Sequence, residues 1–319
     1  MTAGSGYSCY SSSARVFVDI NSDGNINLDL CEEYIRKDKE IKAIYTVHFS
    51  GNPVDQKKLK YLKDKYNIKI LEDCSHSLGA YQNLNNEIIK AGSCKYSDCS
   101  TLSFHPVKQI TSGEGGAITT NDEKIYQKLL RLRSHGMTRE VSKFKNFELA
   151  FNNKELNSWY YEMQLLGYNY RLTDFQAALG ISQLKKLKFF VEKRKEIAKF
   201  YNSCFENNEI IKPLYTFTDN SSYHLYVILI DFQKIGISKN TFIKKLLEKG
   251  IGSQVHYIPI NQQLYYKGIG YGSEETPVMD NYYEKCLSIP LYPGLKNKDI
   301  EMVSANILNL IKWIIYFKK

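Results

Sequence analysis

In the first part of the chain, the pattern of hydrophobic and polar positions defines two kinds of segment that alternate along the sequence. Helix-like or turn-like stretches, such as residues 54–66, separate short runs rich in β-branched and leucine side chains. The strand-like runs are residues 16–20, 41–47, 68–71, 101–104 and 117–119. Because strands joined by helical crossovers give this alternation, we predict an α/β fold with a largely parallel sheet flanked by helices.

The second half of the chain has a different order of elements. Residues 122–134 are predicted to form a helix, and Thr173 is a suitable cap for a long helix over residues 174–207. Strand-like runs follow at residues 225–230 and 252–257. The predicted organisation is therefore a large domain at 1–172, a connecting helix at 173–207, and a small α+β domain at 208–319.

The C-terminal stretch, IEMVSANILNLIKWIIYFKK, is the most apolar segment of the chain. Polar residues interrupt it, and its hydrophobic residues fall at helical spacing. We therefore predict an amphipathic helix docked on the protein rather than a membrane span.

Composition and charge are those of a globular protein. The chain has 319 residues, of which 43% are hydrophobic and 24% are charged. Lysine and arginine exceed aspartate and glutamate by 43 − 34 = 9, but the lysines are scattered along predicted helices without interleaved aromatic residues. We expect no nucleic-acid partner.

The seven cysteines form no disulfide framework. Cys94 and Cys99 are close in sequence, but no histidine lies nearby at the spacing of a zinc site, so no metal is predicted. No apolar leader follows Met1. Reduced thiols and the absence of a leader favour a cytoplasmic location.

Lys108 stands in a setting that suits covalent chemistry. It lies in a turn-like run after the strand-like TLSF and before the glycine-rich segment GEGG. A lysine held there against a pocket can lose its proton near neutral pH, because burial disfavours the charged amine. Such an amine can form a Schiff base.

Asp73 ends the predicted strand at residues 68–71, where open α/β sheets bind ligands. A carboxylate there can pair with the pyridinium nitrogen of pyridoxal phosphate (PLP), while His76 can contact the ring and Ser103 the phosphate. Taken alone, Asp73 is better explained as a loop cap and His76 as a packed histidine. The combination with SFHPVK, whose Lys108 lies 35 residues after Asp73, favours the functional interpretation.

Several motifs in a fixed order resemble the DegT/DnrJ/StrS family of PLP-dependent sugar aminotransferases. They are EDCSHSLGA, SFHPVK, GEGGAITTND, LRSHGM, GYNYRLTDFQAALGISQLKKL, YHLYVI, GIGSQVHYIPI and LSIPLYPGL. The resemblance runs from about Val16 to the C-terminus. Within the family, it is nearest to enzymes that aminate a UDP-4-keto-6-deoxy-N-acetylhexosamine in pseudaminic acid biosynthesis.

The resemblance implies a PLP-dependent transferase of fold type I, similar to aspartate aminotransferase, that acts as a homodimer. It implies an amino-acid donor, glutamate in the family, and a UDP-linked keto sugar as acceptor, whose diphosphate would suit the positive net charge. Roles are implied for eight residues. Lys108 is the Schiff-base lysine, Asp73 the partner of the pyridine nitrogen, His76 a ring neighbour, Ser103 a phosphate ligand, Asn169 a phosphate ligand for the other subunit, and Gln254, His256 and Tyr257 sugar-nucleotide contacts.

The beginning of the chain departs from the family pattern. Relatives open with a longer segment that contains a glycine-threonine turn around the phosphate and an aromatic residue that stacks on the cofactor. Here Gly4, Ser5 and Gly6 are a poor match for the turn, and Tyr7 or Tyr10 could replace the aromatic residue. Three interpretations stay open: an active aminotransferase, an inactive homologue that serves as a partner subunit, and a fragment of a longer gene.

Overall fold

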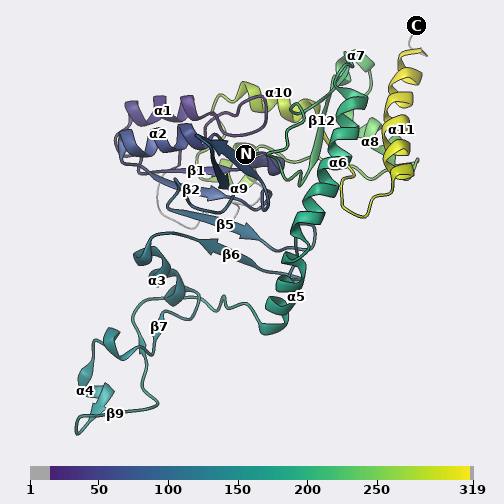
Figure 1. The fold of residues 1–319 in the computed structure, drawn as a ribbon. Helices are drawn as coiled ribbons and strands as arrows, with labels where there is room; N and C mark the ends of the chain where they lie inside the picture. The colour runs from purple at the N-terminus through teal and green to yellow at the C-terminus, as the bar shows by residue number, and fades with distance from the viewer. Residues whose placement is uncertain (1–14, 317–319) are drawn as a thin grey trace.

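The computed structural model describes residues 15–316. Residues 4–10, with the possible phosphate turn and stacking tyrosines, lie outside this range. A four-stranded sheet in the order β1-β2-β5-β6 forms the centre of the large domain (Figure 1). Its strands are β1 (Ala43–Val47), β2 (Lys69–Asp73), β5 (Cys99–Ser103) and β6 (Gly116–Thr119).

The sheet is mostly parallel, as predicted. Strand β2 pairs in parallel with both β1 and β5, while β6 pairs antiparallel with β5. Helices α1 (Leu28–Lys37) and α2 (Gln56–Tyr66) pack beside β1 and β2 around a buried apolar cluster that includes Leu59, Leu62 and Ile70. Asp55 begins α2 by accepting hydrogen bonds from the amides of Lys57 and Lys58.

A long helical segment runs from beside the four-stranded sheet to the C-terminal part of the chain (Figure 1). Thr173 caps it in a capping box with Gln176, as its sequence predicts. The segment is not one helix over 174–207. It divides into α5 (Asp174–Leu184) and α6 (Leu187–Phe205), because the amide of Lys186 bonds to the carbonyl of Gln183, which tightens the turn between them.

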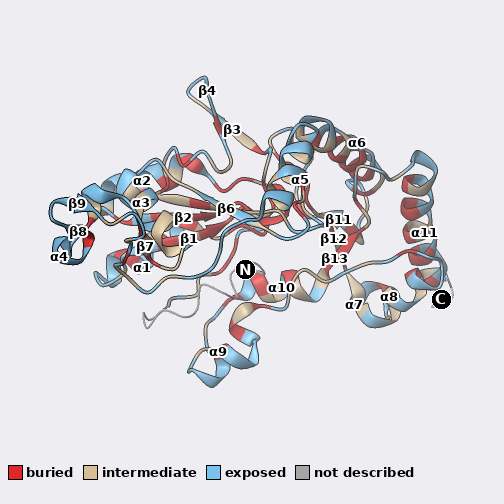
Figure 2. Ribbon diagram, turned by 90° about the horizontal axis from the view of Figure 1, so that it is seen from below, coloured by how far each residue is buried: buried red, intermediate tan, exposed pale blue. Residues whose placement is uncertain are grey.

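The C-terminal part has its own sheet, in the order β11 (Ile211–Pro213), β12 (Tyr226–Ile230) and β13 (Cys286–Ile289). Side chains of α6 and of α11 (Asn297–Tyr316) pack on this sheet in a second apolar core, visible as red segments in Figure 2. Helix α11 confirms the predicted C-terminal amphipathic helix. Within residues 15–316, no helix has both the length and the apolar character that crossing a membrane requires.

Two predicted strands do not form. In residues 16–20 only Ile20 makes a β-bridge, to Ile26, because this segment is held by side chains instead. The Asp19 carboxylate accepts from the amides of Val278 and Met279 at 2.9 Å each, and Phe17 packs edge-on against tyrosines of the C-terminal part. In residues 252–257 only Gln254 pairs, with Ser288.

The remaining elements are connecting pieces and a projecting lobe formed by residues 137–163 (Figure 1). The strands are β3 (Tyr81–Leu84), β4 (Glu87–Lys90), β7 (Met137–Thr138), β8 (Phe151–Asn152), β9 (Glu155–Leu156), β10 (Glu162–Met163), β11 (Ile211–Pro213), β12 (Tyr226–Ile230) and β13 (Cys286–Ile289). The helices are α3 (Glu123–Leu132), α4 (Phe147–Ala150), α7 (Phe232–Ile235), α8 (Lys239–Leu247), α9 (Leu264–Gly268) and α10 (Pro277–Lys285), with short 3-10 turns η2 (Phe49–Gly51), η3 (Val141–Lys143) and η4 (Ile260–Gln262).

Candidate active site

A cleft of about 1700 Å³ lies between the carboxyl ends of β2 and β5 and the C-terminal part of the chain. Asp73, Ser103 and Lys108 line it from the sheet side, and Gln254, His256 and Tyr257 line it from the other side. The carboxyl end of a parallel sheet is where α/β proteins bind ligands, because loops there diverge from the strands. The cleft thus brings together six of the eight residues implicated by the sequence.

Lys108 lies in a compact turn after β5. Its amide donates to the carbonyl of His105 at 3.0 Å, and Ser112 and Thr111 both donate to the carbonyl of Phe104. The turn holds the lysine half-buried in the cleft wall. Burial lowers the pKa of the Lys108 amine to about 8, although the nearby Asp73 carboxylate partly opposes this shift. Lys108 is therefore a nucleophilic amine near neutral pH.

Asp73 is the last residue of β2 and is only 2% exposed. Its Oδ1 accepts from the amide of Ser75 at 2.9 Å, and its Oδ2 from the hydroxyl of Tyr45 at 3.4 Å. These donors hold the carboxylate at the edge of the sheet. A buried carboxylate in this position can stabilise a positive charge in the cleft.

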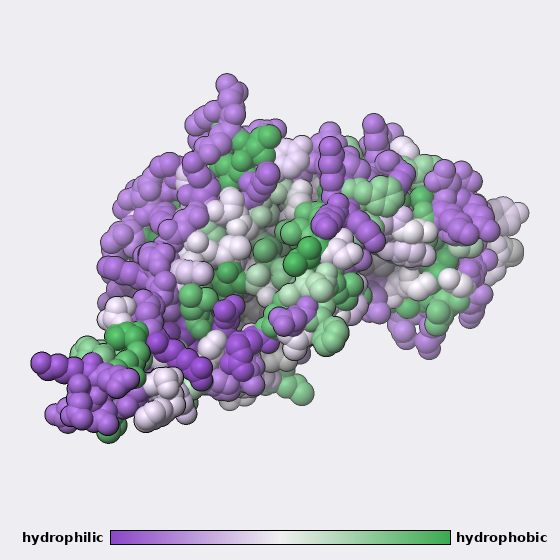
Figure 3. Space-filling model, turned by 60° about the horizontal axis from the view of Figure 1, so that its bottom comes forward, coloured by the Kyte–Doolittle hydropathy of each residue, from purple (hydrophilic) through white to green (hydrophobic). Residues whose placement is uncertain are grey.

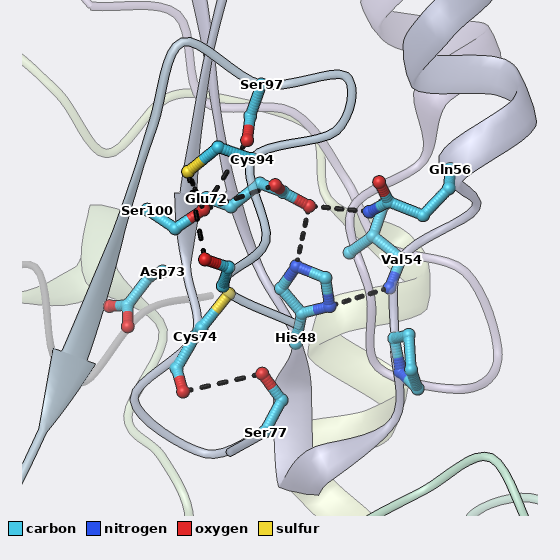
Figure 4. Close-up of polar contacts among 12 residues, drawn as sticks. His48, Val54, Gln56, Glu72, Asp73, Cys74, Ser77, Cys94, Ser97 and Ser100 are labelled. Atoms are coloured by element: carbon cyan, nitrogen blue, oxygen red, sulfur yellow. Dashed lines mark hydrogen bonds and ion pairs between the residues drawn. The ribbon is translucent and has the colours of Figure 1, made fainter. Parts of the chain in front are cut away.

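The neighbouring residue of β2, Glu72, belongs to a buried polar network on the opposite side of the strand (Figure 4). Its carboxylate contacts His48 Nε2 at 2.9 Å and accepts from Gln56 at 2.5 Å and from Ser100 at 3.3 Å. The amide of Val54 donates to His48 Nδ1 at 3.2 Å. Because Nδ1 lies at the Val54 amide, Nε2 is the ring nitrogen that can donate its proton to Glu72.

This buried network helps to hold the strands in place next to Asp73. Burial alone would raise the pKa of Glu72, but hydrogen bonds from His48, Ser97 and Gln56 outweigh burial and lower that pKa to about 2. The amide of His48 also donates to the carbonyl of Asp73 at 3.1 Å. The network therefore joins the ends of β1, β2 and β5 just where Asp73 enters the cleft.

His76 does not line the cleft. Its ring is buried 4.4 Å from the ring of His224, which does line it. Burial, with the Lys108 cation and His256 adding to it, holds the pKa of His76 well below its usual value. The Nδ1 atoms of His76 and His224 both lack a hydrogen-bond partner among residues 15–316. His76 thus lies one layer behind the cleft surface as a neutral ring.

Asn169 is exposed and lies outside the cleft. It pairs with Ser134 through a β-bridge, so that the motif GYNYR runs beside LRSHGM. The two segments approach so closely that a Cβ on Gly136 would lie 1.7 Å from the carbonyl oxygen of Leu165. Glycine is therefore required at position 136, and Asn169 does not line the cleft of its own chain.

The far side of the cleft is formed by the segment that contains Gln254, His256 and Tyr257. His256 Nδ1 lies 2.7 Å from the hydroxyl of Ser288. Burial and the Lys108 cation lower the pKa of His256 to about 4, so its ring is neutral at pH 7. Burial, helped by the Asp73 carboxylate, raises the pKa of Tyr257 to about 12, so its hydroxyl keeps its proton. Both groups can offer hydrogen bonds to a ligand.

The cleft residues that the sequence analysis did not single out include Tyr45, Arg194 and His224. Tyr45 donates to Asp73 from the adjacent strand, which only the strand order reveals. Arg194 had a sequence signal, since it falls at helical spacing among the buried Val191, Ala198 and Tyr201.

The residues of the cleft fit PLP. The Lys108 amine is available for a covalent bond, and the buried Asp73 carboxylate couples electrostatically to it. The Ser103 hydroxyl lines the same wall at the end of β5. Among residues 15–316, no group of three or more histidine, cysteine, aspartate or glutamate side chains could hold a metal ion.

Comparisons with known proteins agree with this arrangement. Residues 6–308 match the DegT/DnrJ/EryC1/StrS aminotransferase family. The chain is 39% identical over 299 residues to the UDP-4-amino-4,6-dideoxy-N-acetyl-beta-L-altrosamine transaminase of Campylobacter jejuni, with 93% of the chain and 73% of that protein covered.

Two solved structures are similar. One is Helicobacter pylori PseC, an aminotransferase involved in the biosynthesis of pseudoaminic acid, with a TM-score of 0.82, 31% identity, and coverage of 94% of this chain and 74% of that one. The other is a Streptococcus pneumoniae protein in its PLP form, with a TM-score of 0.78, 27% identity, and coverage of 95% and 76%. The architecture is thus that of the PLP-dependent aminotransferases of fold type I.

Proposed function

Because the chain belongs to the DegT/DnrJ/EryC1/StrS family of sugar aminotransferases, we propose that it moves an amino group from an amino acid to the 4-keto group of a nucleotide-linked 6-deoxy sugar. The observation that carries this proposal is the Lys108 amine, which is half-buried in the cleft and has a pKa of about 8 beside Asp73. An ordinary surface lysine would stay protonated at pH 7.

Lys108 would hold PLP covalently, Asp73 would pair with its ring nitrogen, and Ser103 would contact its phosphate. When bound, PLP supplies a carbonyl carbon that accepts amines and a ring that withdraws electrons. The Lys108 amine, near neutral in pKa, can take up and return a proton at Nζ within the cleft. The neutral His256 and Tyr257 can orient a sugar by hydrogen bonds without adding charge.

The acceptor we propose is a UDP-4-keto-6-deoxy-N-acetylhexosamine, with glutamate as donor. Support comes from the printed activity of the Campylobacter jejuni relative and from the pathway of Helicobacter pylori PseC. The cleft, at about 1700 Å³, is large enough for a sugar nucleotide together with a cofactor. Gln254 would contact the sugar nucleotide from the segment that closes the far side.

We also propose that the active form is a homodimer. Large apolar side chains are exposed around α5 and the segment before it, and Figure 3 shows hydrophobic clusters around a hollow on one face of the molecule. Phe175 is 91% exposed and Leu166 is 84% exposed, which is unusual for a monomer surface. A partner on this face would cover them and would receive Asn169, which does not reach its own cleft.

The direct test is an amino-transfer assay. Purified protein with PLP, glutamate and UDP-4-keto-6-deoxy-N-acetylglucosamine should form 2-oxoglutarate and a 4-amino sugar in equal amounts. Lys108→Ala should form neither product, whereas Lys188→Ala, an exposed lysine on α6, should be as active as the original protein. Equal activity in both variants would overturn the proposal.

A further inference from the structure

Arg194 is a buried cation in the cleft wall. It lies on α6, is 4% exposed, and lines the cleft together with Phe190, one turn earlier. Its Nη1 donates to the carbonyls of Tyr223 at 3.2 Å, His224 at 3.1 Å and Leu291 at 3.0 Å. Two of these carbonyls precede β12 and the third follows β13, and because Tyr226 pairs with Ile289 in this antiparallel pair, the guanidinium lies where the helix meets one end of the C-terminal sheet.

The positive charge of Arg194 has no acidic partner. No carboxylate among residues 15–316 forms an ion pair with it, although thirteen lysine–carboxylate pairs occur elsewhere in this part of the chain. Its Nε is buried without a hydrogen-bond acceptor. Burial lowers the pKa of Arg194 only to about 10, so it stays charged at neutral pH. A buried charge is normally paired, because removing it from water is unfavourable.

The guanidinium therefore has unused hydrogen-bond donors at the wall of a ligand cleft. Nη1 is occupied by carbonyls, and neither Nε nor Nη2 donates a hydrogen bond to any of residues 15–316. Guanidinium groups bind carboxylates and phosphates through two parallel hydrogen bonds, and such bonds strengthen when water is excluded. Among the described residues 15–316, Lys108 is the only other lysine or arginine that lines the cleft.

We propose that Arg194 is an anion-binding residue of the cleft and that its guanidinium binds a negatively charged group of a substrate. This inference rests on the proposed function, which brings two anionic substrates to the same cleft. One is the amino acid, through its carboxylates, and the other is the sugar nucleotide, through its diphosphate. Both are oxyanions of the class that a guanidinium recognises.

The test uses two variants and one control, each loaded with PLP. Arg194→Lys keeps a charged group that can donate to the three carbonyls but loses the planar fork, and Arg194→Gln removes the charge. The control, Lys188→Gln, removes an exposed charge from the same helix. Affinities for glutarate and for UDP are measured by calorimetry, with the melting temperature and the cofactor absorbance recorded on the same samples.

We expect Arg194→Lys to keep the melting temperature but to weaken the binding of one of the two anions about tenfold or more. Lys188→Gln should change the affinity for neither anion. A loss of affinity for glutarate alone assigns Arg194 to the amino-acid carboxylate, and a loss for UDP alone assigns it to the diphosphate. A loss of affinity for both anions assigns Arg194 to a site that the two substrates share. Unchanged affinities in both Arg194 variants overturn the inference, as does an unaltered protein that forms a normal Lys108 adduct but binds neither anion. A missing Lys108 adduct counts instead against the proposed function.

A second measurement requires no variant and so remains decisive if the Arg194 variants fold poorly. Crystals of the unaltered protein soaked in glutarate or in UDP should show an anionic oxygen within hydrogen-bond distance of the Arg194 guanidinium. Anions found in the cleft but away from Arg194 would overturn the inference.

Discussion

The hydroxyl of Tyr45 donates to the carboxylate of Asp73 at 3.4 Å across the neighbouring strands β1 and β2. The amide of Ser75 donates to the other carboxylate oxygen. Asp73 is thus held by two donors while it remains next to the Lys108 amine, whose pKa it raises against the opposing effect of burial. The reactivity of the lysine is set by the balance of these two effects.

The first prediction concerns the pH dependence of Lys108. With a pKa of about 8, roughly one Lys108 amine in ten is neutral at pH 7, against about one in three thousand for an unperturbed lysine. Acetylation of Lys108 in the protein without cofactor, followed by peptide mass spectrometry, should reach half its maximum near pH 8. The exposed Lys188 serves as the internal reference and should titrate well above that pH. Parallel profiles for the two lysines would contradict the prediction.

The second prediction concerns Asp73→Asn. The substitution removes the negative charge that favours the protonated amine, so the pKa of Lys108 should fall further. The acetylation profile of Lys108 should therefore move to lower pH. Tyr45→Phe, which removes a hydrogen bond but leaves the carboxylate, should move the profile much less. A shift to higher pH in Asp73→Asn would show that the carboxylate does not act on Lys108.

The third prediction concerns the buried network of His48 and Glu72. Replacing His48 by Phe removes a donor to a buried carboxylate and the acceptor of the Val54 amide. The loss should lower the free energy of unfolding by about 2–4 kcal/mol, measured by urea denaturation. Glu40→Gln, at an exposed ion pair, should change it by less than about 0.5 kcal/mol. Comparable effects of the two variants would argue against a supporting role for the network.

The fourth prediction concerns the exposed apolar face. Phe175→Glu should shift the protein from dimer to monomer in sedimentation experiments, because it places a charge where a partner would cover an apolar ring. Tyr34→Glu, on α1 away from α5 (Figure 1), is the matched control and should leave the dimer intact. A monomeric parent protein, or a dimer unaffected by Phe175→Glu, would refute the proposed interface.

Local signals predicted much of the fold and the sheet side of the site. The strands that end at Asp73 and Ser103, the turn at Lys108 and the capping box at Thr173 all follow from residues near one another in sequence. Contacts between distant segments could not be predicted. The segment at residues 16–20 is fixed by α9 and α10, more than 240 residues away, and so does not form the expected strand.

The same limit applies to the far side of the cleft. Arg194 meets Leu291 across 97 residues of sequence, and no local pattern places a carbonyl there. The roles of Asn169, Gln254, His256 and Tyr257 stay predictions, since they depend on a partner subunit or on a bound sugar. The position of Gln254, His256 and Tyr257 in the cleft supports their predicted roles. The exposure of Asn169 outside the cleft is compatible with a role across a dimer interface.

The most direct test of the account is whether Lys108 binds PLP covalently. Purified protein is mixed with PLP, its absorption spectrum is recorded before and after borohydride reduction, and the labelled peptide is identified by mass spectrometry. We predict a new absorption band that reduction removes and a stable label on the peptide that contains Lys108, both lost in Lys108→Ala. A spectrum identical in the original protein and in Lys108→Ala would contradict the central claim that this lysine is the centre of an aminotransferase site.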